Sequence, residues 1–127
     1  MKEKKALKKI FNEKIYIDIF GTNIYFFDDK EKYNKALDYR EGTSYNCHLG
    51  VAYKSTLENK DTKEENTIYM LGVFNGDKSC LMHECIHIAL FIMEDIGQAL
   101  SYKDEVLPYL AQTIFIEAQN FMDKRDK

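Results

Sequence analysis

The segment from His83 to His87 has residue types and a spacing that suit metal chemistry. It reads His-Glu-Cys-Ile-His and so contains the pattern His-Glu-x-x-His. On an α-helix, side chains four positions apart lie on one face, which would let His83 and His87 bind one tetrahedral zinc ion. Glu84 is turned about 100° around the helix and could contact a zinc-bound water as a general base. Since zinc lowers the pKa of such a water to about 7, the pattern predicts a hydrolytic site.

The residues that flank this motif predict a buried helix. Positions 80–82 and 88–93 are apolar on nearly all sides of a helix. Buried polar groups without partners cost several kcal/mol, and a metal ion would supply a partner for both imidazoles. The alternative interpretation is a pair of core histidines that bond to neighbouring carboxylates. We favour the metal site.

A catalytic zinc site needs a third protein ligand and leaves a fourth position for water. Glu105 is the first candidate, because it lies near the start of the next predicted helix, which can return antiparallel to the motif. The adjacent Asp104 is its main rival within that segment. His48 is the one other histidine, and Cys80 shares the helical face of the motif histidines. If Cys80 closed the site, the zinc would be structural rather than catalytic.

Tyr109 is a second candidate catalytic residue. It lies one helical turn after Glu105 and could point into the same space, where a hydroxyl could stabilise an oxyanion. The chain contains nine tyrosines, so packing is the alternative role for Tyr109. The sequence therefore predicts Glu84 and Tyr109 as catalytic residues, beside three metal ligands.

The elements that would position this site follow from hydrophobic periodicity and turn residues. The predicted strands cover residues 15–20, 24–27, 47–54 and 67–74. The predicted helices cover residues 1–14, 30–39, 77–97 and 103–121. We expect Asp28 or Asp29 to cap the second helix and Gly42 to end it. Asp77 or Ser79 would cap the motif helix. The charged segment 55–66 predicts an exposed loop.

This order of elements predicts a single α+β domain over residues 1–127. Its small, mostly antiparallel four-stranded sheet would carry the two C-terminal helices on one face. Hydrophobic residues make up 45% of the chain, which is enough for one core without disulfide bonds. The basic helix over residues 1–14 would be a solvated or frayed terminus.

The net charge and the cysteine content of the chain limit which cellular compartment and which partners are expected. The 18 basic and 21 acidic residues give a net charge of −3, so nucleic acid is not an expected partner. Three cysteines cannot all pair internally, which favours a reducing, cytoplasmic setting. No apolar stretch reaches the roughly 18–20 residues of a membrane span, and no signal peptide is indicated.

The motif and the residues that follow it resemble the small zincin-like proteins of phages and prophages, and more broadly the gluzincins. The resemblance covers roughly residues 67–120 and is carried by residues 83–87, Gly97, Asp104, Glu105, Tyr109 and Leu110. It implies a minimal metallopeptidase fold with Zn²⁺ bound by His83, His87 and Glu105. It also implies that Glu84 is the general base. It names no substrate, and Cys80 and Cys85 depart from it by placing soft ligands near the site.

We therefore expect a zinc-dependent hydrolase, a small phage-type metallopeptidase that acts on a peptide or protein. Substrate would pair along residues 67–74, the strand before the motif helix, taken here as an edge strand. The alternative is a non-catalytic binding protein with the same fold, for example a phage-encoded inhibitor of a host defence factor. In that case zinc would be structural or absent.

Overall fold

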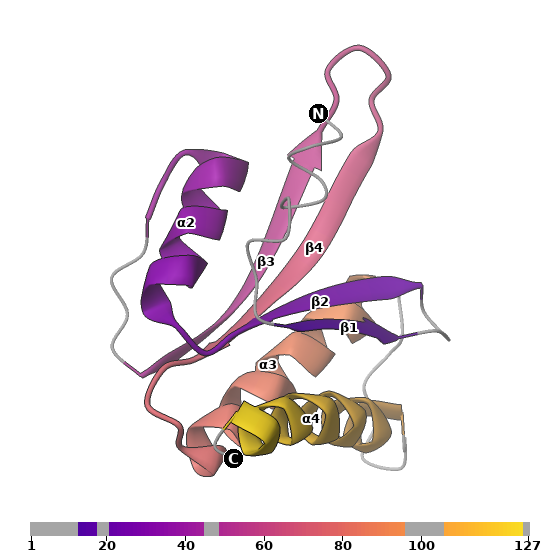
Figure 1. Ribbon diagram of the computed structural model, residues 1–127. Helices are drawn as coiled ribbons and strands as arrows, with labels where there is room; N and C mark the ends of the chain where they lie inside the picture. The colour runs from indigo at the N-terminus through magenta and orange to yellow at the C-terminus, as the bar shows by residue number, and fades with distance from the viewer. Residues whose placement is uncertain (1–12, 18–20, 45–48, 96–105, 126–127) are drawn as a thin grey trace.

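A mixed sheet of four strands separates the described helices into two layers (Figure 1). The computed structural model describes residues 13–17, 21–44, 49–95 and 106–125. The strands are β1 (Glu13–Ile17), β2 (Thr22–Phe27), β3 (Gly50–Glu58) and β4 (Glu65–Val73). The helices are α2 (Lys30–Glu41), α3 (Lys78–Asp95) and α4 (Val106–Arg125). Most of the helix expected over residues 1–14 lies outside the described residues, and its last two positions belong to β1.

The strand order is β1-β2-β4-β3, which confirms the α+β class with a four-stranded sheet. The predicted hairpin of β1 and β2 is antiparallel, as is the pair β3 and β4. The central pair, β2 and β4, is parallel. The sheet is therefore mixed, with two antiparallel pairings and one parallel pairing.

The expectation that residues 67–74 form an edge strand is wrong. These residues fall mostly within β4, which pairs with β2 on one side and with β3 on the other. Ile68 to Val73 are all buried, so β4 is covered on both faces. A continuous apolar run is typical of such a central strand. Because both edges of β4 are already paired over Tyr69–Gly72, no substrate can add a strand there.

Each face of the sheet has its own apolar core. On one face, α2 packs through Tyr33, Ala36 and Leu37, and the strands contribute a buried set made up of Tyr25, Phe27, Val51, Ile68 and Met70. On the other face, α3 and α4 cover alternate strand residues, namely Ile15, Ile17, Ile24, Phe26, Tyr69, Leu71 and Val73. The two C-terminal helices thus share one face, as predicted.

The ends of α2 confirm the predicted caps. The Asp29 carboxylate accepts a hydrogen bond from the Glu31 main-chain N–H at 2.8 Å. Gly42 follows the helix with φ of 71°, in the left-handed region that favours glycine, and its N–H donates to the Asp38 carbonyl.

Half of the loop expected over residues 55–66 is strand. β3 continues to Glu58 and β4 begins at Glu65, so the connection spans only residues 59–64. Ser55 is fully buried: its Oγ accepts from Arg40 Nε at 2.7 Å and its carbonyl accepts from Nη2 at 2.9 Å. Arg40 Nη2 also donates to the Asn66 carbonyl at 2.8 Å. The charged residues Lys60, Asp61, Lys63 and Glu64 do lie in the exposed connection, so the expectation of a loop holds for residues 59–64.

None of the three described helices combines the length and the apolar character that a membrane crossing requires.

Candidate metal centre

The N-terminus of α3 is capped by Asp77. Its Oδ1 accepts from the Ser79 main-chain N–H at 2.8 Å and from the Ser79 hydroxyl at 2.7 Å. The Leu81 N–H donates to the Asp77 carbonyl at 3.0 Å, which is the first helical hydrogen bond. The Ser79 hydroxyl and then the Ser79 N–H hold the pKa of Asp77 below its ordinary value. Of the two predicted caps, the structure therefore selects Asp77.

The expectation that the motif helix is buried on nearly all sides is wrong. One stripe of α3 faces the core, through the buried residues Leu81, Cys85, Ile88, Ala89, Ile92 and Met93. His83 and His87 lie on the exposed face, together with Met82 and Ile86, which are 39% and 42% exposed. Met82, in the flank, and Ile86, within the motif, are apolar residues typical of a core, yet both face outward. The cost of burying unpaired imidazoles therefore gives no argument for a metal here.

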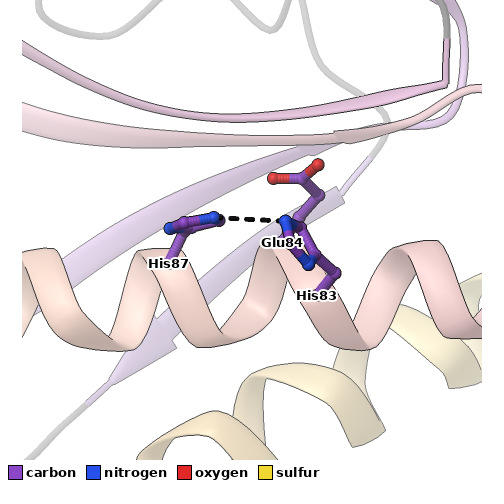
Figure 2. Close-up of side chains that lie close together, drawn as sticks. All are labelled: His83, Glu84 and His87. Carbon is purple, nitrogen blue, oxygen red and sulfur yellow. Dashed lines mark hydrogen bonds between the residues drawn. The ribbon is translucent and has the colours of Figure 1, made fainter.

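The two histidines nevertheless converge on one point. Their Nε2 atoms lie 3.2 Å apart, and their rings are 4.8 Å apart at an interplanar angle of 74° (Figure 2). Without a metal, this contact is a hydrogen bond in which one ring donates and the other accepts. Their ligand atoms and a Glu84 carboxylate oxygen all lie within 4.8 Å of one another. His83, Glu84 and His87 are thus the three candidate ligand residues that the described chain gathers here.

The separation of the imidazole nitrogens fits a shared metal ion. Two nitrogens that each lie 2.0–2.1 Å from one tetrahedral zinc ion are about 3.3 Å apart. The observed 3.2 Å is close to that value, so both rings could hold one ion with little movement. Imidazole and carboxylate are also a donor set that zinc accepts in hydrolytic sites.

Glu84 leaves the helix on a different side from the imidazoles. It is partly buried, and its carboxylate extends toward the strands that run above α3 in Figure 2. A Cβ placed on Gly50, the first residue of β3, would lie 3.3 Å from Glu84 Cγ. The start of β3 therefore lies directly against the Glu84 side chain. Sequence reasoning missed Gly50, because no local pattern signals an approach between residues so far apart.

Neither described cysteine belongs to the cluster. Cys85 is fully buried, and burial followed by the nearby Glu84 charge raises the pKa of its thiol to about 12. The Sγ of Cys80 lies beneath Gly50, where a Cβ on that glycine would be 2.7 Å from it. Cys80 is not among the residues whose ligand atoms gather with the histidines. The structure therefore gives no support to Cys80 as a ligand.

The remaining predicted site residues divide into two groups. Glu105, Asp104 and His48 lie outside the described residues. Tyr109 is on α4 and 66% exposed, and its hydroxyl makes no hydrogen bond to the three clustered residues in the described part of the chain. The catalytic role of Tyr109 therefore stays a prediction.

Both ends of α3 are tied to neighbouring elements. At its C-terminal end, the Asp95 carboxylate accepts hydrogen bonds from the Tyr69 hydroxyl and from Lys54. Burial and then the Asp95 hydrogen bond raise the pKa of Tyr69. At its N-terminal end, Lys78 donates to Asp123 on α4 at 2.9 Å, which shows that α3 and α4 run antiparallel, as predicted. These contacts fix the helix that carries the histidines.

Comparisons with protein-family models, with curated proteins and with solved structures each found no match.

Proposed function

We propose that this protein is a zinc-dependent hydrolase in which His83 and His87 bind the metal and Glu84 is the general base. The observation that carries the proposal is the 3.2 Å separation of the two Nε2 atoms, with a Glu84 carboxylate beside them. The zincin-like resemblance adds Glu105 as the third ligand. Peptides are the proposed substrate class, in line with the same resemblance.

The three clustered residues would divide the chemistry between them. A zinc ion, when bound, supplies Lewis acidity and lowers the pKa of a coordinated water. His83 and His87 would hold it as neutral imidazoles, each through Nε2. Glu84 emerges from the next position around the helix, so its carboxylate can take the proton of an attacking water and deliver it to the leaving amine. Partial burial between α3 and the start of β3 keeps that carboxylate from swinging freely.

A second candidate function is a binding protein that uses the same surface without catalysis. It is favoured by the exposure of His83 and His87, and by the exposed Met82 and Ile86 beside them. Apolar side chains next to polar ones on an open helix face are typical of surfaces that bind proteins. A metal in this case would only stabilise the helix.

Replacing Glu84 by glutamine separates the two functions. The zinc-loaded protein, Glu84→Gln and the matched control Glu94→Gln would be incubated with a complex peptide mixture, and new termini counted by mass spectrometry. Glu94 is exposed on the same helix and outside the cluster. We expect cleavage by the parent and by Glu94→Gln, and a loss of about 10²–10⁴-fold in Glu84→Gln with zinc content retained. Undiminished cleavage by a zinc-loaded Glu84→Gln would remove the hydrolase proposal, and no cleavage by the loaded parent would favour the binding protein.

A further inference from the structure

The start of β3 approaches α3 so closely that only glycine fits. A Cβ on Gly50 would lie 2.7 Å from Cys80 Sγ, 2.9 Å from the Gly72 carbonyl oxygen and 3.3 Å from Glu84 Cγ. Contacts below 3.0 Å require a neighbour to move, because packed interiors have little free space. Gly50 has no positive φ, so space rather than backbone conformation restricts this position.

We infer that Gly50 is a positioning residue for Glu84. Its missing side chain lets the backbone of β3 rest on the Glu84 side chain and hold the carboxylate beside the two imidazoles. The effect of Gly50 on catalysis rests on the proposed function, whereas the contact between Gly50 and Glu84 does not.

The three neighbours differ in how easily they can yield to a methyl group at position 50. The Gly72 carbonyl belongs to β4, the central strand, whose hydrogen bonds to β2 and β3 fix it. Cys80 is in the first turn of α3, so moving its Sγ either changes its rotamer or tilts that turn away from β3. The next turn carries Glu84, and a tilt would displace its carboxylate. Glu84 is also the most flexible of the three neighbours. Because the Cys80 Sγ contact is the shortest and the Gly72 carbonyl is fixed in the sheet, a methyl group at position 50 relaxes mainly by displacing Cys80 and the first turn of α3, and Glu84 moves with that turn.

Gly72 supplies a matched control on the same pair of strands. A Cβ there would lie 2.6 Å from the Phe74 ring and 2.9 Å from Val51 Cγ1, on the face of the sheet that α2 covers. Gly72→Ala should therefore crowd the opposite core and cost stability without moving Glu84. Cys80→Ala added to Gly50→Ala removes the shortest of the three contacts and should restore part of the Glu84 position.

The test is nuclear Overhauser contacts between residue 50 and the Glu84 side chain, measured by NMR on the metal-free parent and on each variant. We expect a Gly50 Hα–Glu84 Hγ contact in the parent and in Gly72→Ala. In Gly50→Ala the contacts of Glu84 should change, and the double variant should recover them in part. On any peptide that the parent cleaves, Gly50→Ala should lower kcat by about 10–100-fold with KM unchanged, since small misplacements of a catalytic group have effects of this size.

The NMR measurement tests whether Gly50 positions Glu84 even if no peptide is cleaved and the proposed function fails. Absence of the contact in the parent would overturn it, and that measurement needs no variant to fold. A well-folded Gly50→Ala protein whose Glu84 contacts match those of Gly72→Ala would overturn it as well. Equal losses of kcat in both glycine variants would show a general packing effect and contradict a positioning role.

Discussion

At the scale of single residues, the buried Arg40 joins several polar groups in one network. Its guanidinium is fully buried, and burial lowers its pKa while the neighbouring Glu41 charge raises it. Main-chain carbonyls and the Ser55 hydroxyl accept its hydrogen bonds, and Ser55 in turn donates to Glu41. The Glu41 carboxylate also accepts from the Tyr53 hydroxyl at 2.7 Å. This network joins the end of α2 to the β3–β4 hairpin.

Ser55→Ala should destabilise the fold by about 1–3 kcal/mol, because it removes the hydroxyl that accepts from the buried Arg40 Nε and donates to Glu41. Denaturant unfolding would measure this change as a shift of the midpoint. The slope of the unfolding free energy against denaturant concentration should stay the same. Ser44→Ala makes the same chemical change at an exposed position and should stay within about 0.5 kcal/mol of the parent. Equal stability of the two variants would show that the Ser55 hydroxyl contributes nothing.

Residue types alone predicted the convergence of His83 and His87, because helical spacing is a local property. They could not predict the exposure of those histidines, which depends on which faces of α3 other elements cover. Met82 and Ile86 are apolar yet exposed. The buried Ser55 was also missed, since nothing local signals an arginine reaching it from another element.

At the scale of elements, hydrophobic periodicity and turn residues predicted the positions of most helices and strands. Asp29, Gly42 and Asp77 sit at helix ends where a side-chain acceptor or a positive φ is needed, and those requirements act over a few residues. The strand pairing was harder to predict. The parallel pairing of β2 with β4 joins residues far apart in the chain, such as Ile24 and Tyr69, and no turn fixes its register.

The cap of α3 makes stability depend on pH. Hydrogen bonds from Ser79 lower the pKa of Asp77 in the folded state. The Asp77 carboxylate therefore stabilises the fold at pH values above the ordinary aspartate pKa, near 4. That contribution is lost as pH falls through the lower, folded-state value. Asp77→Ala should reduce the melting temperature at pH 7. On acidification, the melting temperature of Asp77→Ala should then fall less than that of the parent. Asp77→Asn should keep most of the cap.

Thermal melts of the parent and both Asp77 variants between pH 7 and pH 3 would check this. The same pH dependence in the parent and in Asp77→Ala would show that the Asp77 carboxylate does not cap α3 in solution.

At the scale of the whole molecule, α3 is held at each end while its outer face stays open. Asp95 ties one end to β3 and β4, and Lys78 ties the other end to α4. The histidines therefore lie on a helix whose two ends are both tied to neighbouring elements. A metal bound there would stabilise the folded state by mass action, by about 2.7 kcal/mol at a concentration 100 times its Kd.

Zinc binding to the metal-free protein is the property that the proposed metal centre requires first. Titration calorimetry, with X-ray absorption of the loaded sample, would count bound zinc and identify its ligands. We expect one zinc per chain with two imidazole nitrogens in its coordination shell. His83→Ala and His87→Ala should each lose this binding, and Glu84→Gln should retain it. A protein that binds no zinc under these conditions, or histidine variants that bind it as the parent does, would contradict the account.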